Sequence, residues 1–237
     1  MSPKVSYVIP VYNEEAILHA AVVDLREQLS SFDLEYEVLL AENGSRDDTV
    51  AIGERLAKKY PEVAVFSIGA PNYGAALRAG IERATGEYVI CEEIDLCDVD
   101  FHMRALALLE AHDADMVIGS KLLDESLDDR PFTRHAASLL YNGLLRVMLG
   151  FKGTDTHGLK AFRREVMLPI ASACVVDKDV FASELVIRAY REDIRIREIP
   201  VRVKEKRTPS INLLNRVPNV VKNLVKLTRA IHASPRR

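Results

Sequence analysis

The chain has 237 residues, of which 48% are hydrophobic and 28% are charged, and its formal net charge at pH 7 is −3. Such a composition can bury a sizeable core, so it excludes the disordered and fibrous classes and fits one large α/β domain. The nearly balanced charge gives no reason to expect a nucleic-acid partner. The charge is uneven, because from Lys204 to the end the chain has nine Lys or Arg and one acidic residue, Glu205.

The cysteines and the N-terminus bear on the cellular compartment. Cys91, Cys97 and Cys174 form no CxxC pair, so we expect free thiols in a reducing cytosol. The N-terminus passes directly into an apolar strand, without the charged leader and cleavage site of a signal peptide. No stretch approaches the about 20 consecutive apolar residues of a membrane-spanning helix. We therefore expect a cytoplasmic protein that does not itself cross a membrane.

Short apolar runs alternate with amphipathic segments along the first 120 residues. The apolar runs predict buried strands at Val5–Pro10, Tyr36–Leu40, Val63–Ile68, Tyr88–Cys91 and Met116–Gly119. The amphipathic segments predict helices at Glu14–Leu29, Asp47–Lys59, Tyr73–Ala84 and near His102–Ala111. This alternation predicts βαβ units and a mostly parallel central sheet with helices on both faces.

The alternation weakens beyond residue 120. A strongly periodic helix is predicted over Arg134–Leu149, and a late strand over Ile194–Val203. From Ile211 onward an apolar stripe recurs at helical spacing, with basic residues mainly elsewhere on the helix. We therefore divide the chain into one domain over 1–210 and a basic amphipathic helix and tail over 211–237.

Polar residues gather where the predicted strands end. They follow the first four strands at Asn13–Glu15, Glu42–Asp48, Asn72 and Glu92–Asp100. The carboxyl ends of parallel strands meet at one edge of a sheet, and ligands bind there. The pattern favours a binding site at this edge over scattered surface charge.

The densest of these clusters follows the fourth strand. Its five carboxylates are Glu92, Glu93, Asp95, Asp98 and Asp100. Carboxylates so close together repel one another unless a cation compensates. Mg²⁺ or Mn²⁺ would suit, because either ion is commonly held by one or two carboxylates together with substrate phosphates, and would neutralise a departing nucleoside diphosphate. A simple acidic surface loop is the alternative.

Four segments in order resemble a known family. They are Val5–Glu15 (VSYVIPVYNEE), Glu42–Thr49 (ENGSRDDT), Asn72–Tyr88 and Asp155–Arg164 (DTHGLKAFRR). The first three resemble family 2 glycosyltransferases, and the fourth is similar to a motif of the polyprenyl-phosphate mannose and glucose synthases. The resemblance covers roughly residues 5–210. It implies the GT-A fold and an inverting, metal-dependent transfer from a nucleoside-diphosphate sugar.

The resemblance also implies roles for residues on the donor side. Those that would line the base and ribose pocket are Pro10, Tyr12, Glu14 and Asn43. Glu93 and Asp95 occupy the place of the family's Asp-x-Asp and would hold the metal and the diphosphate. Glu93 stands where the family usually has Asp, and Asp98 could supply a further oxygen ligand.

The acceptor decides which further groups the site needs. A sugar hydroxyl needs a general base, whereas a lipid phosphate is already anionic and needs cations to position it. Lys121, Arg134 and Ser138 match positions that the polyprenyl-phosphate synthases use for the acceptor phosphate. Arg134 and Ser138 are four residues apart, so they share one helix face. That subgroup also has a basic loop that closes over the diphosphate. The residues here that resemble it are Lys204, Lys206, Arg207 and Ser210.

Together these features predict an enzyme, a hexosyltransferase of family 2. It would use Mg²⁺ or Mn²⁺ to move a hexose from a nucleotide-sugar donor to a polyprenyl phosphate at the cytoplasmic face of the membrane. The segment 211–231 would contact the membrane surface or a partner subunit, or dock on its own domain. The alternatives are a transferase acting on a soluble or glycan hydroxyl, and a catalytically inactive protein that binds nucleotide sugar or a partner.

Overall fold

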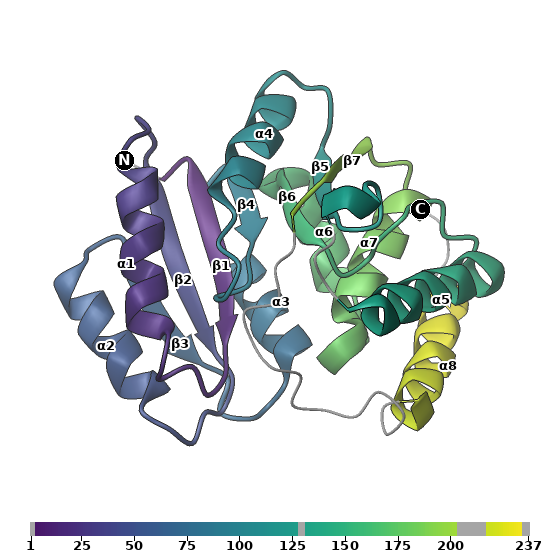
Figure 1. Cartoon of the computed structure of the whole chain (residues 1–237), viewed down its shortest axis with the longest axis horizontal. Coiled ribbons are helices and arrows are strands. Elements are labelled where there is room, and N and C mark those ends of the chain that lie inside the picture. The colour runs from purple at the N-terminus through teal and green to yellow at the C-terminus, as the bar shows by residue number, and fades with distance from the viewer. Residues whose placement is uncertain (1–2, 128–130, 203–216, 234–237) are drawn as a thin grey trace.

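The computed structural model describes residues 3–127, 131–202 and 217–233 (Figure 1). Seven strands form one sheet in the order β3-β2-β1-β4-β6-β5-β7. The strands are β1 Val5–Val11, β2 Tyr36–Glu42, β3 Val63–Ser67, β4 Tyr88–Cys91, β5 Met116–Ser120, β6 Leu159–Arg163 and β7 Ile196–Pro200. The helices are α1 Leu18–Leu29, α2 Thr49–Lys59, α3 Tyr73–Arg83, α4 Val99–Glu110, α5 Phe132–Leu149, α6 Arg164–Ala173, α7 Phe181–Arg191 and α8 Val217–Ala233.

The predicted mostly parallel sheet is confirmed, with one exception. All strands and helices expected before residue 120 are present, with ends that differ by a few residues. β6 runs antiparallel to both of its neighbours, β4 and β5. This strand and helices α6 and α7 had no counterpart in the sequence-based prediction, and β7 lies within the late strand expected at Ile194–Val203.

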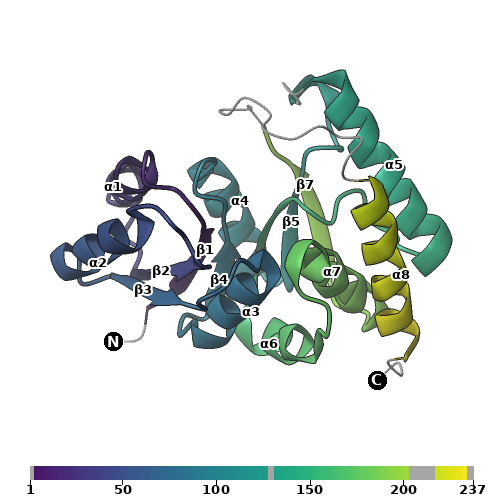
Figure 2. The same cartoon turned by 90° about the horizontal axis from the view of Figure 1, so that it is seen from below.

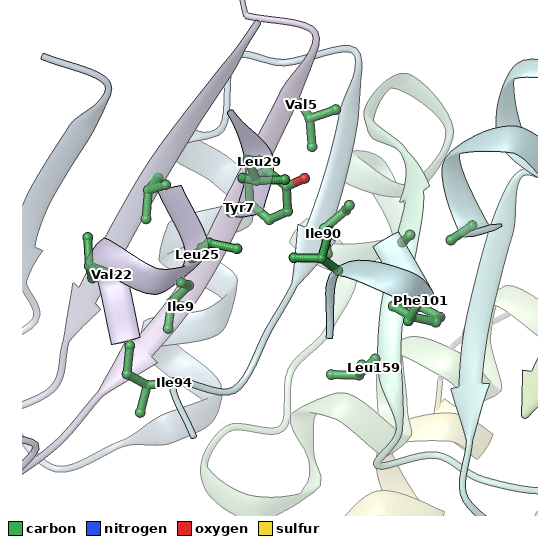
Figure 3. Packing of buried hydrophobic residues seen from close by; sticks show 14 of the residues in the cluster. Val5, Tyr7, Ile9, Val22, Leu25, Leu29, Ile90, Ile94, Phe101 and Leu159 are labelled. Carbon is green, nitrogen blue, oxygen red and sulfur yellow. The ribbon is translucent and has the colours of Figure 1, made fainter. Parts of the chain in front are cut away.

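Alternate side chains of each strand enter two separate core layers. In β1, Tyr7 and Ile9 belong to one buried cluster, with side chains of α1, α2 and α4 (Figure 3). Val8 points the other way, into a cluster with side chains of α3, α6 and α7. Helices therefore cover both faces of the sheet, as the βαβ pattern requires.

The strand order creates a switch point beside β1. The chain moves outward from β1 to β2 and β3, then crosses back to place β4 on the other side of β1. The connection after β1 therefore leads toward β3 at one end of the sheet and the connection after β4 toward β7 at the other, and such a switch point is where open α/β sheets bind ligands. Because β6 is antiparallel, it begins at this same edge, which is where β5 and β7 end.

The C-terminal helix α8 packs on its own domain. Leu224, Leu227 and Ile231 are buried in the second core cluster. For the described part of the tail, the apolar stripe is therefore an internal contact and not an exposed face. The predicted boundary at residue 210 lies outside the described residues. In the ranges that the structure describes, no helix combines the length and apolarity needed to cross a membrane.

Candidate active site

The loops after β1 and β2 are joined to each other. The Asn13 side chain accepts a hydrogen bond from the backbone N–H of Arg46 at 2.9 Å. Asn13 adopts a φ of 55°, a left-handed conformation that Asn tolerates better than most residues. Asn43, buried at the end of β2, donates its side-chain amide to the carbonyl of Val11 at 3.1 Å. These bonds fix the edge formed by the two strands.

All four residues predicted for the nucleotide pocket lie at this edge. Pro10 is buried within β1, and Asn43 directly follows β2 beside it. Tyr12 follows β1 and is 39% exposed, and Glu14 is half-buried one turn before α1. The structure therefore brings these residues together at the ends of two adjacent strands.

Glu92 shapes the acidic loop after β4 from within. It is buried, and its carboxylate is hydrogen-bonded to the Nε2 atom of the buried His102. The same carboxylate accepts the backbone N–H groups of Glu93, at 2.8 Å, and Asp98, at 3.2 Å. Glu92 therefore holds the loop together and does not face a ligand.

Two further carboxylates of this cluster have local partners. Asp98 caps helix α4 by accepting the backbone N–H of Phe101 at 3.0 Å. Asp100 is exposed and pairs with the arginine four residues on. No three His, Cys, Asp or Glu side chains among the described residues form a group that could hold a metal. Glu93, Asp95 and Asp98 therefore do not form such a group, and a role of Asp98 as a third ligand stays a prediction.

Glu93 has an unusual environment. Its carboxylate accepts a hydrogen bond from the Tyr73 hydroxyl at 2.5 Å. Burial raises the pKa of Glu93 to about 7, and the neighbouring charges of Asp95 and Glu92 add to this, although the Tyr73 bond and the buried Lys160 act in the opposite direction. A desolvated carboxylate beside a second carboxylate is an excess of negative charge that a divalent cation would relieve. The hard oxygen donors of Glu93 and Asp95 therefore fit Mg²⁺ or Mn²⁺.

Two lysines lie at the same edge, on the far side of β4. Lys160 is buried in β6 opposite Cys91 of β4, and its Nζ donates to the carbonyl of Gly158 at 2.6 Å. Lys121, directly after β5, lies 3.3 Å from the buried carboxylate of Asp155. Burial alone would raise the pKa of Asp155, but Lys121 and a backbone N–H outweigh it and lower that pKa. Positive charge therefore adjoins the acidic loop.

Helix α5 carries the other predicted acceptor residues that the structure describes. Ser138 donates its hydroxyl to the carbonyl of Arg134 at 3.0 Å, so both lie on one side of the helix. One turn on, the Tyr141 ring packs against His157, with ring centroids 5.2 Å apart. Asp155 accepts the backbone N–H of His157 and pairs with Lys121, so through the Tyr141–His157 contact α5 rests on the loop that holds Lys121.

The other four predicted acceptor or diphosphate residues lie outside the described residues. They are Lys204, Lys206, Arg207 and Ser210. The strand that precedes them, β7, ends at Pro200 on the same edge of the sheet.

Sequence reasoning missed two contributors to the site. Tyr73 contacts Glu93 although it lies twenty positions earlier in the chain, and no sequence pattern predicts such a contact. Lys160 had a usable signal, because it is a lysine inside a short run of otherwise buried residues, Leu159–Arg163. A buried lysine in a strand is rare unless it is paired.

The sheet order, with its switch point beside β1, defines the fold. The glucosyl-3-phosphoglycerate synthase of Mycobacterium tuberculosis, in a crystal structure with Mn²⁺ and UDP-glucose, has the same fold, with a TM-score of 0.64 at 18% identity. That similarity covers 98% of this chain and 80% of that one. The architecture is that of the GT-A glycosyltransferases.

The sequence places the chain more narrowly. Residues 6–168 match Glycosyl transferase family 2, and the chain belongs to this family. Glycosyltransferase AglD of Haloferax volcanii is 28% identical over 98% of this chain and 38% of its own length. The undecaprenyl-phosphate 4-deoxy-4-formamido-L-arabinose transferase of Sodalis glossinidius is 32% identical over 69% of this chain and 50% of its own length. The chain thus spans half or less of the length of these two relatives.

Proposed function

We propose that this chain transfers a hexose from a nucleoside-diphosphate sugar to a polyprenyl phosphate at the cytoplasmic face of a membrane. Family membership supports the transfer, and the relative from Sodalis glossinidius, named for its undecaprenyl-phosphate acceptor, supports the acceptor class. The observation that carries the proposal is the Glu93–Asp95 pair at the switch point, with Glu93 hydrogen-bonded to Tyr73 and two lysines on the far side of β4.

On the donor side, the edge of β1 and β2 would receive the nucleotide. Pro10, Tyr12, Glu14 and Asn43 would form the base and ribose pocket. Glu93 and Asp95 would hold the divalent metal, which supplies charge neutralisation to the diphosphate. The Mn²⁺ in the M. tuberculosis structure supports the use of a divalent ion in this fold. Tyr73 would keep the Glu93 carboxylate aimed by its hydrogen bond.

On the acceptor side, an oxygen of the acceptor phosphate would attack the anomeric carbon. The bond between that carbon and the diphosphate oxygen breaks, the configuration inverts, and the nucleoside diphosphate leaves with the electron pair. No general base is needed, because the attacking phosphate is already ionised. Lys121, Arg134 and Ser138 would position it, together with Lys204, Lys206, Arg207 and Ser210. Asp155 keeps Lys121 in place.

The proposal is tested by transfer of a radiolabelled sugar into the organic phase. A panel of UDP-, GDP- and dTDP-sugars with Mn²⁺ or Mg²⁺ should give label in the organic phase only when polyprenyl phosphate is present. Asp95→Asn should abolish transfer, whereas Asp100→Asn, a matched change at an exposed neighbour, should leave it intact. Unchanged turnover in Asp95→Asn would refute the assignment of the site. Label that stays in the aqueous phase on a soluble acceptor would favour the hydroxyl-acceptor alternative.

A further inference from the structure

The outward face of helix α5 is apolar and exposed. Its five exposed large side chains are Leu139 (47%), Leu140 (67%), Leu144 (36%), Val147 (86%) and Met148 (37%). On the opposite side of the same helix, Asn142 and Leu145 are buried against the domain. An exposed apolar stripe of this size on a soluble domain marks a surface that meets something else.

The helix that carries this stripe and its neighbour α8 contain basic residues and no acidic ones. Figures 1 and 2 show α5 beside α8, at the end of the molecule away from α1 and α2. Neither helix contains an acidic residue, although the whole chain has a net charge of −3. Their five Lys or Arg residues are Arg134, Arg146, Lys222, Lys226 and Arg229.

Helix α8 contributes charge to this surface. Its apolar residues Leu224 and Leu227 are buried, so its exposed side presents Lys222 and Arg229. Neither of these two forms an ion pair with another described residue, whereas Lys226 pairs with Asp177 at 3.1 Å. We call the exposed apolar residues of α5 together with Lys222 and Arg229 the α5–α8 surface.

We infer that the α5–α8 surface lies on an anionic lipid bilayer, with α5 parallel to the membrane plane. An apolar helix face flanked by lysine and arginine binds where acyl chains meet headgroups. Each basic residue near an anionic membrane strengthens binding about fivefold. A second copy of the chain fits less well, because a twofold interface would bring the same basic side chains face to face.

This inference rests on the proposed function, which places the chain at a membrane face, and deepens it by naming the surface that meets the lipid. The outward face of α5 would meet the lipid, while Tyr141 on its inner side touches His157 in the loop before β6. If the proposed function holds, one helix thus joins the bilayer to the predicted acceptor residues Arg134 and Ser138. Vesicle binding and sugar transfer can be measured separately, so failure of either is distinguishable.

The test is co-sedimentation of the full chain with vesicles. Binding to vesicles of equal parts phosphatidylglycerol and phosphatidylcholine should exceed binding to pure phosphatidylcholine, and should weaken as salt shortens the Debye length from about 10 Å to about 3 Å. Leu140→Ser/Val147→Ser should lower the binding at least about tenfold. Val50→Ser, at an exposed position of α2, is the matched control and should have no effect.

A charge-reversed variant separates the electrostatic contribution to vesicle binding from the apolar one. Lys222→Glu/Arg229→Glu should weaken binding to the anionic vesicles by at least about 25-fold and leave the weak binding to phosphatidylcholine unchanged. The inference is overturned if the wild type stays in the supernatant with anionic vesicles, or if Val50→Ser and Leu140→Ser/Val147→Ser behave alike. A dimer in sedimentation velocity that Leu140→Ser/Val147→Ser dissociates, without vesicle binding, would assign the surface to a second copy instead.

Discussion

Replacing Tyr73 by Phe should make metal binding depend on a higher pH. The substitution deletes only the hydroxyl that donates to Glu93 at 2.5 Å. This bond favours the ionised carboxylate, and a hydrogen bond to a charged group contributes about 1.5–3 kcal/mol. Its loss should therefore raise the pKa of Glu93 by about 1–2 units from its value of about 7.

The magnitude at pH 7 follows from the ionised fraction. In the wild type about half of the Glu93 side chains are ionised at pH 7, and in Tyr73→Phe about 1–10% would be. A metal binds the deprotonated ligand, so the apparent Mn²⁺ affinity at pH 7 should fall about 5- to 50-fold. The two proteins should converge at alkaline pH, where Glu93 is ionised in both.

Calorimetric titration of Mn²⁺ at a series of pH values measures this directly. Tyr190→Phe is the matched control, because Tyr190 also donates to a carboxylate, that of Glu198 at 3.2 Å, away from the acidic loop. The control should bind Mn²⁺ like the wild type. If Tyr73→Phe shows the same affinity and pH dependence as the wild type, the Tyr73–Glu93 bond does not set the ionisation of the site.

Two further predictions concern residues around the Glu93–Asp95 pair. Asp98→Ala should lower the stability of the fold by about 1 kcal/mol, since it removes a helix cap, whereas Asp98→Ser keeps a capping oxygen and should retain both stability and Mn²⁺ affinity; weaker Mn²⁺ binding in the Ser variant would make Asp98 a ligand after all. Lys121→Met should destabilise the fold at pH 7 by about 3 kcal/mol in urea titrations, because it leaves the buried Asp155 carboxylate without its cation. The pKa of Asp155 is lowered by folding, so its stabilising effect is present above the ordinary pKa of about 3.9 and is lost as the pH falls through the lowered value. The difference between wild type and Lys121→Met should shrink over that acidic range, and a difference independent of pH would instead indicate lost packing.

The first half of the fold could be predicted because each element there shows its period. Strands such as Val5–Val11 are continuous apolar runs, and helices such as α1 bury one face only. In the second half, burial does not follow the sequence pattern. In α7 every residue from Phe181 to Ala189 is buried, including Glu184 and Arg188, which pair with each other, so the polar face of this helix is not a solvent-exposed one. β6 carries Lys160 and Arg163 inside a buried strand, which defeats a hydrophobic pattern.

The position of the acidic cluster after β4 could be predicted, but the contacts of each carboxylate could not. A cluster of carboxylates after an apolar strand locates a site, because parallel strands end at one edge. Which carboxylate faces inward depends on contacts distant in sequence. Glu92 is hydrogen-bonded to His102, ten positions away, and Glu93 to Tyr73, twenty positions away. The apolar stripe of the tail was visible in the sequence, but its burial against the domain was one of several readings.

The antiparallel direction of β6 has a consequence for how such a domain can change. β5 ends and β6 begins at the same edge of the sheet, so the intervening chain, residues 121–158, leaves and returns beside the acidic loop. That excursion contains α5 and the Lys121–Asp155 pair, while the loops proposed for the donor follow β1, β2 and β4. Its length and surface can therefore vary without shifting the register of any strand. If the proposed function holds, a change in this one inserted segment would alter the acceptor site and leave the loops proposed for the donor as they are.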